Sequence, residues 1–420
     1  MFNVKELPNT QGILNAAEIL EGVVKTTPLE LNHQLSEEFG AKIYLKREDL
    51  QVVRSYKIRG AYNFISRLSL EERKLGVVTS SAGNHAQGVA MSCSMLGIKG
   101  LIFMPATTPK QKIRAVQRLG KEWVEVVLTG DTYDDAKAAA TRYCKKNNTP
   151  FVPPFDAKYI IEGQGTVGLE IFHQLKNHAP DYIFVPIGGG GLIAGLITYF
   201  KEKFPNTKII GAEPLGAPAM AESLQQKKVV VLDKIDSFVD GAAVKQVGNL
   251  TYAIIKDKMD DIILVPEGKI CTKILQLYNR DAIVAEPAGA LSVAALDFYK
   301  DKIHGKKVVC ILSGGNNDIE RMQEIKERSL LYEGLKHYFI IKFPQRSGAL
   351  KEFVNKVLGP DDDITLFEYT KKNSKESGPA LVGVESKSKD DFDGLIKRMS
   401  KYGVDYTHLN ENPTLFNFLI

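Results

Sequence analysis

The feature that most limits the possible folds of this chain is a repeated alternation of short apolar runs with longer amphipathic stretches. The apolar runs are residues 42–45, 76–79, 100–103, 125–128, 182–185, 208–211 and 307–312. Amphipathic stretches with helical spacing lie between them, at residues 85–96, 109–119 and 132–146 among others. This alternation is typical of α/β proteins in which helices cover twisted, mostly parallel sheets. Ligands of such proteins bind beyond the carboxyl ends of the strands.

The end of the chain follows a different pattern. Strands are predicted at residues 337–343, 364–370, 380–385 and 405–408. Helices are predicted at residues 349–358 and 390–399. The resulting order β-α-β-β-α-β is that of a ferredoxin-like α+β domain. Because a chain of 420 residues exceeds the size of a single hydrophobic core, we expect two domains, residues 1–330 and residues 331–420.

Composition and charge exclude several classes of function. The formal net charge of +5 is spread along the chain without runs of Lys and Arg, which gives little support to a nucleic-acid partner. No apolar run reaches the ~18 residues of a membrane span. The four cysteines are far apart and form no Cys-x-x-Cys pair, as is typical of reduced thiols. We therefore expect a cytoplasmic protein that binds a small anionic molecule, with neither a nucleic-acid nor a membrane partner.

A run of four glycines at residues 188–191 separates the apolar run 182–187 from a helical stretch that begins at Leu192. Backbone N–H groups at such a strand-to-helix turn converge on an anion, and glycine has no side chain to obstruct the approach. A flexible turn is the alternative interpretation. The loop lacks the lysine of a P-loop and the spacing of a dinucleotide fingerprint, so a phosphate smaller than a nucleotide is the better candidate ligand.

Lys57 stands in the sequence Ser-Tyr-Lys-Ile-Arg-Gly-Ala at the start of a helical pattern. The positive end of a helix dipole lowers the pKa of a nearby amine. A neutral amine can form an imine with an aldehyde. Most lysines are solvated surface groups, so a chemical role for Lys57 depends on the motifs that accompany it.

Two further loops follow predicted strands. The sequence Ser-Ala-Gly-Asn-His at residues 81–85 opens a helix, so its N–H groups can bind a carboxylate and Asn84 can hydrogen-bond a ring hydroxyl. A helix cap with a packed histidine explains the same residues. The sequence Ser-Gly-Gly-Asn-Asn at residues 313–317 follows the run 307–312, and the Ser313 hydroxyl would point into the same crevice.

These four motifs, in this order, resemble those of the fold-type II pyridoxal-phosphate enzymes and, among them, the biosynthetic threonine dehydratases. The likeness extends over almost the whole chain. It implies a two-lobed catalytic core in residues 1–330, with a small lobe at about residues 46–150 inserted in the large lobe. It also implies an amino-acid-sensing, ACT-like regulatory domain in residues 331–420. One departure is Ser347, which precedes Gly348 where the family often has Pro-Gly.

The resemblance implies a role for each motif. Lys57 would hold pyridoxal 5′-phosphate as a Schiff base and would be the catalytic residue that removes the Cα proton. Asn84 would contact the 3′-oxygen of the cofactor, and Ser313 its pyridine nitrogen. The phosphate would be bound by Gly188, Gly189, Gly190, Gly191 and Leu192. The substrate carboxylate would be bound by Ser81, Ala82, Gly83, Asn84 and His85.

The resemblance also implies a reaction, the conversion of L-threonine to 2-oxobutanoate and ammonia by α,β-elimination, with slower turnover of L-serine. This is the first step of isoleucine biosynthesis. Isoleucine, or alternatively valine, would bind the C-terminal domain as an allosteric effector, and the protein would form a homotetramer. No metal is expected, because Ala219 stands where relatives that bind a divalent ion have an acidic residue after Glu213.

Some alternatives stay open. Glu286, in the sequence Ala-Glu-Pro-Ala-Gly, would either line the site near the cofactor ring or cap the helix that follows it. A related enzyme would act mainly on serine, by elimination or by β-replacement to cysteine or cystathionine, because one methyl group is worth only about 1 to 3 kcal/mol in a pocket. A non-enzymatic amino-acid sensor would use the ferredoxin-like domain and would carry no bound cofactor.

Overall fold

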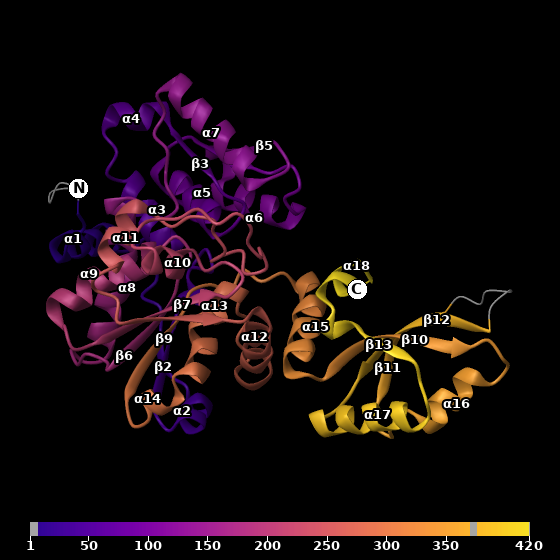
Figure 1. Cartoon of the computed structure of the whole chain (residues 1–420). Coiled ribbons are helices and arrows are strands. Elements are labelled where there is room, and N and C mark those ends of the chain that lie inside the picture. Colours follow the sequence, from indigo (N-terminus) through magenta and orange to yellow (C-terminus); the bar gives the residue numbers. More distant parts are fainter. Residues whose placement is uncertain (1–6, 370–375, 420) are drawn as a thin grey trace. The chain divides into compact units, whose positions relative to one another are not determined.

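The computed structural model of the chain describes residues 7–369 and 376–419. The chain divides into two compact units, Met1–Asp318 and Ile319–Ile420 (Figure 1). The boundary expected between residues 330 and 331 falls inside helix α15, Met322–Glu333, which belongs to the second unit. The division therefore lies at the loop before this helix, where the last strand motif of the first unit ends.

The first unit is built on a six-stranded sheet with the strand order β1-β2-β9-β6-β7-β8. Its strands are β1 Leu29–Leu31, β2 Lys42–Arg47, β6 Tyr182–Pro186, β7 Lys208–Pro214, β8 Asp261–Val265 and β9 Lys307–Leu312. Strand β1 pairs antiparallel with β2, and the other pairs are parallel. The central strands are apolar along their length and buried on both faces, as parallel strands between helical layers are. The expected mostly parallel α/β architecture is confirmed.

A second sheet of the first unit has the order β3-β4-β5, and its strands are parallel. They are β3 Val77–Ser80, β4 Gly100–Met104 and β5 Val124–Leu128. In Figure 1 this sheet and helices α5, α6 and α7 appear in purple shades, above the elements of the larger sheet. Two separate small cores of apolar residues include β4, one with Ile102 and Met104 and the other with Phe103.

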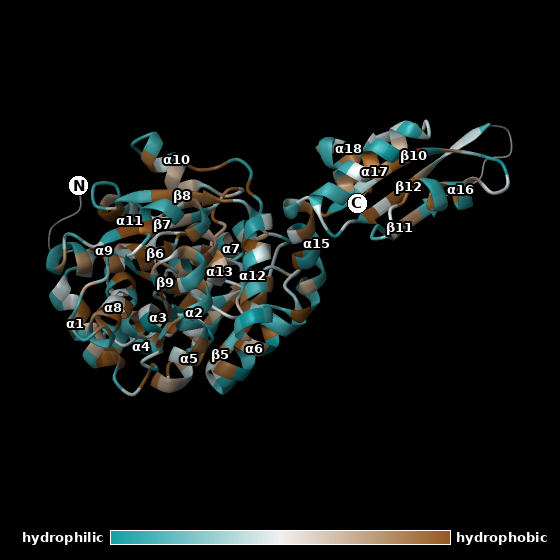
Figure 2. Cartoon of the chain, turned by 90° about the horizontal axis from the view of Figure 1, so that it is seen from below, coloured by the Kyte–Doolittle hydropathy of each residue, from teal (hydrophilic) through white to brown (hydrophobic). Residues whose placement is uncertain are grey.

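The helices of the first unit are α1 Thr10–Leu20, α2 His33–Phe39, α3 Lys57–Ile65, α4 Leu70–Leu75, α5 Asn84–Leu96, α6 Lys110–Gly120, α7 Tyr133–Asn147, α8 Lys158–Gln174, α9 Gly191–Lys203, α10 Ala219–Gln225, α11 Asn249–Ile255, α12 Glu267–Asp281, α13 Pro287–Ala294 and α14 Lys300–Ile303. Short 3₁₀ turns occur at Glu48–Leu50, Lys121–Trp123 and Ala295–Phe298. Figure 2 shows teal and brown segments alternating along helices such as α6, as one-sided packing requires.

Local sequence explains where these helices begin and end. The Thr132 hydroxyl accepts a hydrogen bond from the Asp135 N–H, and the Asp135 carboxylate accepts one from the Thr132 N–H, which forms a capping box before α7. Helix α5 ends at Gly97, whose left-handed backbone (φ 65°) closes the last turn. In the parts of the chain that the structure describes, no helix combines the length and apolar character needed to cross a membrane.

The second unit contains a four-stranded antiparallel sheet with the order β11-β12-β10-β13. Its strands are β10 Lys336–Pro344, β11 Asp363–Tyr369, β12 Ser377–Glu385 and β13 Tyr406–His408. Its helices are α15, α16 Ala349–Lys356, α17 Lys389–Lys401 and α18 Pro413–Leu419, with 3₁₀ turns at Ile319–Arg321 and Leu409–Glu411. From β10 to β13 the order is β-α-β-β-α-β, so the ferredoxin-like prediction is confirmed. Residue 370, the predicted end of the second strand, lies outside the described residues.

The core of the second unit lies between this sheet and helices α16 and α17. Phe339 and Val382 of the two central strands are fully buried against Leu395 and Met399 of α17. Phe343 packs edge to face on Phe353 of α16. Both strands therefore direct alternate side chains into one hydrophobic core, as the period of two in their sequences predicts.

Candidate active site

The motifs that the sequence singled out lie at strand ends and helix starts. Helices α3, α5 and α9 begin at Lys57, Asn84 and Gly191 respectively. Ser313 directly follows β9, a central strand of the large sheet. These are the positions at which parallel α/β proteins present groups to ligands.

Hydrogen bonds join three of these segments to one another. The Tyr56 N–H, next to Lys57, donates to the Ser313 carbonyl at 3.3 Å. The Asn316 side-chain amide donates to Asn84 Oδ1 at 2.6 Å and to the Val53 carbonyl at 2.9 Å. The start of α3, the start of α5 and the end of β9 therefore meet in one place.

Lys57 is partly buried, and its Nζ donates to the Pro154 carbonyl at 3.1 Å. Burial lowers the pKa of this amine from its usual value to about 8, while the Glu286 carboxylate opposes the shift. A larger fraction of Lys57 is therefore neutral at neutral pH than of a surface lysine. A neutral amine is the form that attacks an aldehyde and that accepts a proton from carbon.

Glu286 accepts a hydrogen bond from the Asn84 side-chain amide, with Oε1 at 2.6 Å from Nδ2. The carboxyl group is buried, and burial raises its pKa to about 7, with a further contribution from the Asp240 carboxylate and an opposing one from Asn84. Glu286 occupies the N-cap position of α13. Its side chain nevertheless makes no hydrogen bond to the N–H groups of the first turn of this helix. The side chain of Glu286 therefore contacts Asn84 instead of capping α13.

The glycine loop, residues 188–191, connects β6 to α9. Gly190 has a left-handed backbone (φ 92°), which favours glycine. A Cβ atom on Gly189 would lie 2.1 Å from the ring of Phe155, so any side chain there would displace the loop or the ring. The first N–H groups of α9 have no acceptor within the helix. Leu192, the next residue, is buried in the large apolar core and anchors this end of α9.

Ser313 is buried, and its hydroxyl donates to the Ala288 carbonyl of α13 at 3.2 Å. The oxygen keeps its lone pairs for a further donor. The structure thus brings a neutral hydroxyl, rather than a carboxylate, to the end of β9.

The serine loop, residues 81–85, crosses from β3 to α5. The Gly83 N–H donates to the Ser81 hydroxyl at 3.2 Å. A Cβ atom on Gly83 would meet no atom of the described chain within 4 Å, so space adjoins the loop. Ala82 packs against the apolar core beside β4. His85 is buried and pairs through Nε2 with the Val152 carbonyl at 3.0 Å. Burial, together with the charge of Lys57, lowers the pKa of His85 to about 3, so this histidine is neutral.

Taken together, these groups suit a phosphorylated aldehyde. The amine of Lys57 can bond the aldehyde carbon, and the glycine loop offers backbone amides to a phosphate. Two hydroxyls near these segments, Ser55 Oγ and Ser80 Oγ, are buried and have no hydrogen-bond partner among the described residues. Buried hydroxyls of this kind are stabilised when a ligand supplies the missing partner.

Sequence reasoning missed several residues of this region. Asn316 holds Asn84 in place, Asp156 and Thr251 contact the segments around the glycine loop, and Phe155 covers the loop. No sequence motif marks them, because each is far along the chain from its partner. For Asn316 alone there was a signal in the sequence, because Gly-Gly-Asn follows Ser313 at the end of β9.

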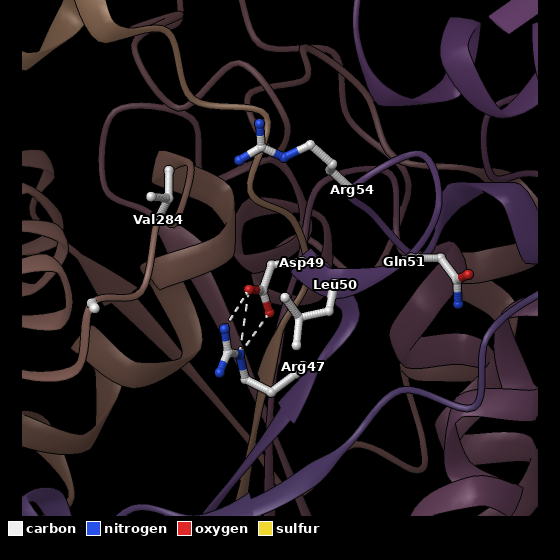
Figure 3. A pocket seen from close by; sticks show the side chains of 7 residues that line it. Arg47, Asp49, Leu50, Gln51, Arg54 and Val284 are labelled. Atoms are coloured by element: carbon white, nitrogen blue, oxygen red, sulfur yellow. Dashed lines mark hydrogen bonds and ion pairs between the residues drawn. The ribbon is translucent and has the colours of Figure 1, made fainter.

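A pocket of about 320 Å³ lies beside the segment after β9, since Gly315 of this segment is close to its lining residues Asp49 and Val284 (Figure 3). Its lining residues are Arg47, Asp49, Leu50, Gln51, Arg54, Ala282 and Val284. Arg47 and Asp49 form an ion pair with 2.8 Å between Nη2 and Oδ2. The Arg54 carbonyl accepts from the Gly315 N–H at 2.9 Å, so the pocket wall and the loop after Ser313 share a backbone contact. The sequence did not predict this pocket.

No cluster of three or more His, Cys, Asp or Glu side chains able to hold a metal occurs in residues 7–369 and 376–419. Glu213 is engaged by the backbone instead. Its carboxylate accepts from the N–H groups of Met220 at 2.7 Å and of Ala221 at 3.0 Å. Burial raises its pKa to about 8.

Two family profiles match the chain. A profile described as "Pyridoxal-phosphate dependent enzyme" matches residues 20–314. A profile described as "C-terminal regulatory domain of Threonine dehydratase" matches residues 327–419. The first covers the unit that carries Lys57 and the glycine loop, and the second covers most of the ferredoxin-like unit.

Curated relatives and solved structures agree with these profiles. The L-threonine dehydratase biosynthetic IlvA of Halalkalibacterium halodurans is 60% identical over 98% of this chain and 99% of the relative. That of Bacillus subtilis is 56% identical over 100% of this chain and 99% of the relative. The processed form of threonine deaminase isoform 2 from Solanum lycopersicum is 42% identical, with a TM-score of 0.72 over 78% of this chain and 91% of that one. Maize serine racemase is 31% identical, with a TM-score of 0.71 over 78% and 99% of the two chains. The chain therefore belongs to the pyridoxal-phosphate-dependent enzymes, in the group whose catalytic part is followed by a threonine dehydratase regulatory domain.

Proposed function

We propose that the protein converts L-threonine to 2-oxobutanoate and ammonia by α,β-elimination. The observation that carries this proposal is the meeting of the Lys57 amine with the Asn84–Glu286 pair and the end of β9 in one place. The relatives named threonine dehydratase share both the catalytic and the regulatory part of the chain. Bound pyridoxal phosphate supplies an electron sink that stabilises negative charge at the substrate's Cα.

The residues of the site would divide the work as follows. Lys57 would hold the cofactor through its aldehyde, and the neutral Lys57 amine would take the proton from the substrate's Cα. The glycine loop and Leu192 bind the phosphate. Asn84 donates one amide hydrogen to Glu286 and has a second for the 3′-oxygen of the cofactor. Ser313 faces the pyridine nitrogen.

The serine loop would bind the carboxylate of the substrate. Its N–H groups lie at the start of α5, where the helix dipole favours negative charge. Because His85 is neutral and donates through Nε2 to Val152, it adds no positive charge to this loop. Backbone amides and the Ser81 hydroxyl are then the groups that orient the carboxylate.

The direct experiment is product analysis with the two hydroxy amino acids supplied separately. Purified protein should release 2-oxobutanoate from L-threonine, and pyruvate from L-serine more slowly. The variant Lys57→Ala should release neither. Faster release of pyruvate than of 2-oxobutanoate would make the protein a serine-directed enzyme. Formation of cysteine when sulfide is added with serine would make it a β-replacement enzyme.

The regulatory part supports a proposal about control. Isoleucine, or alternatively valine, binds the second unit and lowers activity through a coupling free energy of about 1 to 3 kcal/mol between the two sites. A serine-directed enzyme has no need of a regulatory domain of the threonine dehydratase type, which favours threonine as the substrate. The sheet β3-β4-β5 with its helices would form the small lobe, at about residues 46–150.

The proposal also covers the oligomeric state of the protein and its location in the cytoplasm. The protein would form a homotetramer, with no nucleic-acid or membrane partner. All four cysteines are free thiols, which fits the reducing conditions of the cytoplasm. Sedimentation of the purified protein, with and without isoleucine, tests the tetramer.

A further inference from the structure

A short segment before α8 touches both the Lys57 amine and the glycine loop. The Pro154 carbonyl accepts from Lys57 Nζ at 3.1 Å. The next residue, Phe155, lies so close to the glycine loop that Cβ atoms on Gly189 and Gly191 would come within 2.1 Å and 3.0 Å of it. One wall of the glycine loop is therefore formed by the same segment that holds the amine.

The third residue of this segment, Asp156, holds the first turn of α11. Its carboxylate accepts from the N–H groups of Asn249 at 3.0 Å, Leu250 at 2.9 Å and Thr251 at 3.1 Å. Asp156 thus caps a helix that is distant in the sequence, since Asp156 and Leu250 are separated by 94 positions. A carboxylate in such a position stabilises a helix start by about 1 kcal/mol.

The capped turn in turn holds the glycine loop. Thr251 is fully buried, and its hydroxyl donates to the Gly189 carbonyl at 2.7 Å. The Gly248 N–H donates to the same carbonyl at 3.3 Å. Because the peptide bond is trans and planar, a carbonyl of Gly189 that points to α11 directs the Gly190 N–H to the opposite side, away from α11. Thr251 therefore fixes the direction of an N–H group in the glycine loop.

We propose that Thr251 and Asp156 are positioning residues that set the affinity of the glycine loop for the cofactor's phosphate. The proposal rests on the proposed role of residues 188–192 as the phosphate cradle. Thr251 acts on the loop directly, and Asp156 acts through the first turn of α11. Without the Thr251 hydroxyl, the Gly189 carbonyl loses its shorter hydrogen bond, and only the longer bond from the Gly248 N–H still orients the peptide that carries the Gly190 N–H.

The test compares cofactor-free protein for its affinity toward pyridoxal 5′-phosphate and toward pyridoxal, which lacks the phosphate. Both dissociation constants come from the absorbance of the bound aldehyde. Thr251→Val removes the hydroxyl at constant shape and should raise the dissociation constant for pyridoxal phosphate about tenfold. The constant for pyridoxal should not change. Thr251→Ser should keep the wild-type preference, and Asp156→Ala, which removes the acceptor of the first turn of α11, should act in the same direction as Thr251→Val.

A matched control is available in the helix that follows the glycine loop. The Thr198 hydroxyl donates to the Ala194 carbonyl at 2.8 Å, within α9. Thr198→Val removes the same kind of hydrogen bond away from the loop and should leave both dissociation constants unchanged. Melting curves of the cofactor-free variants show that each is folded.

The possible outcomes distinguish a wrong assignment of the phosphate-binding loop from a wrong assignment of the positioning residues. If the wild type binds pyridoxal as tightly as pyridoxal phosphate, the glycine loop is no phosphate cradle and the proposed site is wrong. If the wild type prefers the phosphate and Thr251→Val keeps that preference in full, the site stands and the positioning role is overturned. Equal weakening of both ligands by Thr251→Val also overturns it, because a general structural defect would act on both.

Discussion

At the scale of single residues, two titratable groups at the site have pKa values close to neutrality. Burial lowers the pKa of Lys57 to about 8 and raises that of Glu286 to about 7. The Glu286 carboxylate raises the pKa of Lys57 again by its charge. The protonation of Glu286 therefore influences how much of the Lys57 amine is neutral near pH 7.

The shifted pKa of Glu286 predicts a pH dependence of stability. Between its usual value of 4.5 and about 7, Glu286 keeps its proton in the folded chain and loses it in the unfolded chain. The unfolded state then binds fewer protons, so the free energy of unfolding falls as the pH rises through this window. A shift of this size corresponds to roughly 3 kcal/mol.

Glu286→Gln should remove this part of the pH dependence, because glutamine is neutral and can still accept from Asn84. Urea unfolding of cofactor-free protein at pH 4.5 and at pH 7 measures the difference, and the fluorescence of Trp123, the single tryptophan, reports on the first unit. If wild type and variant lose the same stability between the two pH values, Glu286 does not titrate in this window.

The residues of the site were predictable to different degrees. Lys57, Asn84 and Ser313 could be found because each stands at a strand end or helix start, where parallel α/β folds present ligands. Asp156 and Thr251 could not be found, because their contact joins a loop to the first turn of α11, and the two residues are separated by 95 positions. The neutral state of His85 also could not be predicted, since it follows from burial beside Lys57.

At the scale of elements, helix α3 is held by a buried network of charges. Arg59, two residues after Lys57, pairs with Glu48 at 2.8 Å and with Glu170 of α8 at 2.6 Å. Lys46 of β2 pairs with Glu170 at 2.5 Å. Arg59, Glu48 and Lys46 are fully buried. The network connects β2, α3 and α8, and so it fixes the helix on which Lys57 stands.

Arg59→Met should destabilise the first unit by about 3 to 5 kcal/mol, because Glu48 would remain buried without its partner. Urea unfolding followed by Trp123 fluorescence measures the loss. Lys74→Met is the control: Lys74 pairs with Glu71 at 3.1 Å with both side chains exposed, and its loss should cost no more than about 0.5 kcal/mol. Equal losses in the two variants would mean that the buried network contributes nothing beyond a surface pair.

The strands show what hydrophobic periodicity can predict. Strands such as β2, β6 and β9 were predicted because they are apolar, short and bounded by loops. Strand β1 was missed because it has three residues and pairs antiparallel at the sheet edge. Strand β8 was missed because the apolar run at residues 262–265 is too short to distinguish a strand from a helix by period alone.

At the scale of the whole molecule, the chain joins a catalytic unit to a ferredoxin-like unit. Each has its own hydrophobic core, so each is expected to fold when separated. The sequence predicted the second unit from β10 onward, because its strands alternate clearly. It placed the boundary inside α15, since a charged amphipathic helix carries no sign of the unit to which it belongs.

A chain that ends at residue 318 should keep the threonine-dehydrating activity and lose the response to isoleucine. The cut follows the division between the units and removes α15 entirely. Initial rates with increasing isoleucine measure the response, with the full chain as the reference. An isoleucine response of unchanged size in the shortened chain would place the effector site in the first unit.

The proposed activity depends on Lys57 as the residue that bonds the cofactor. Borohydride reduction of the protein loaded with pyridoxal phosphate, followed by peptide mass spectrometry, tests this directly. The predicted result is one pyridoxyl group per chain, on Lys57, and none in Lys57→Ala. A pyridoxyl group on another lysine of the wild type, or on none, would contradict the account.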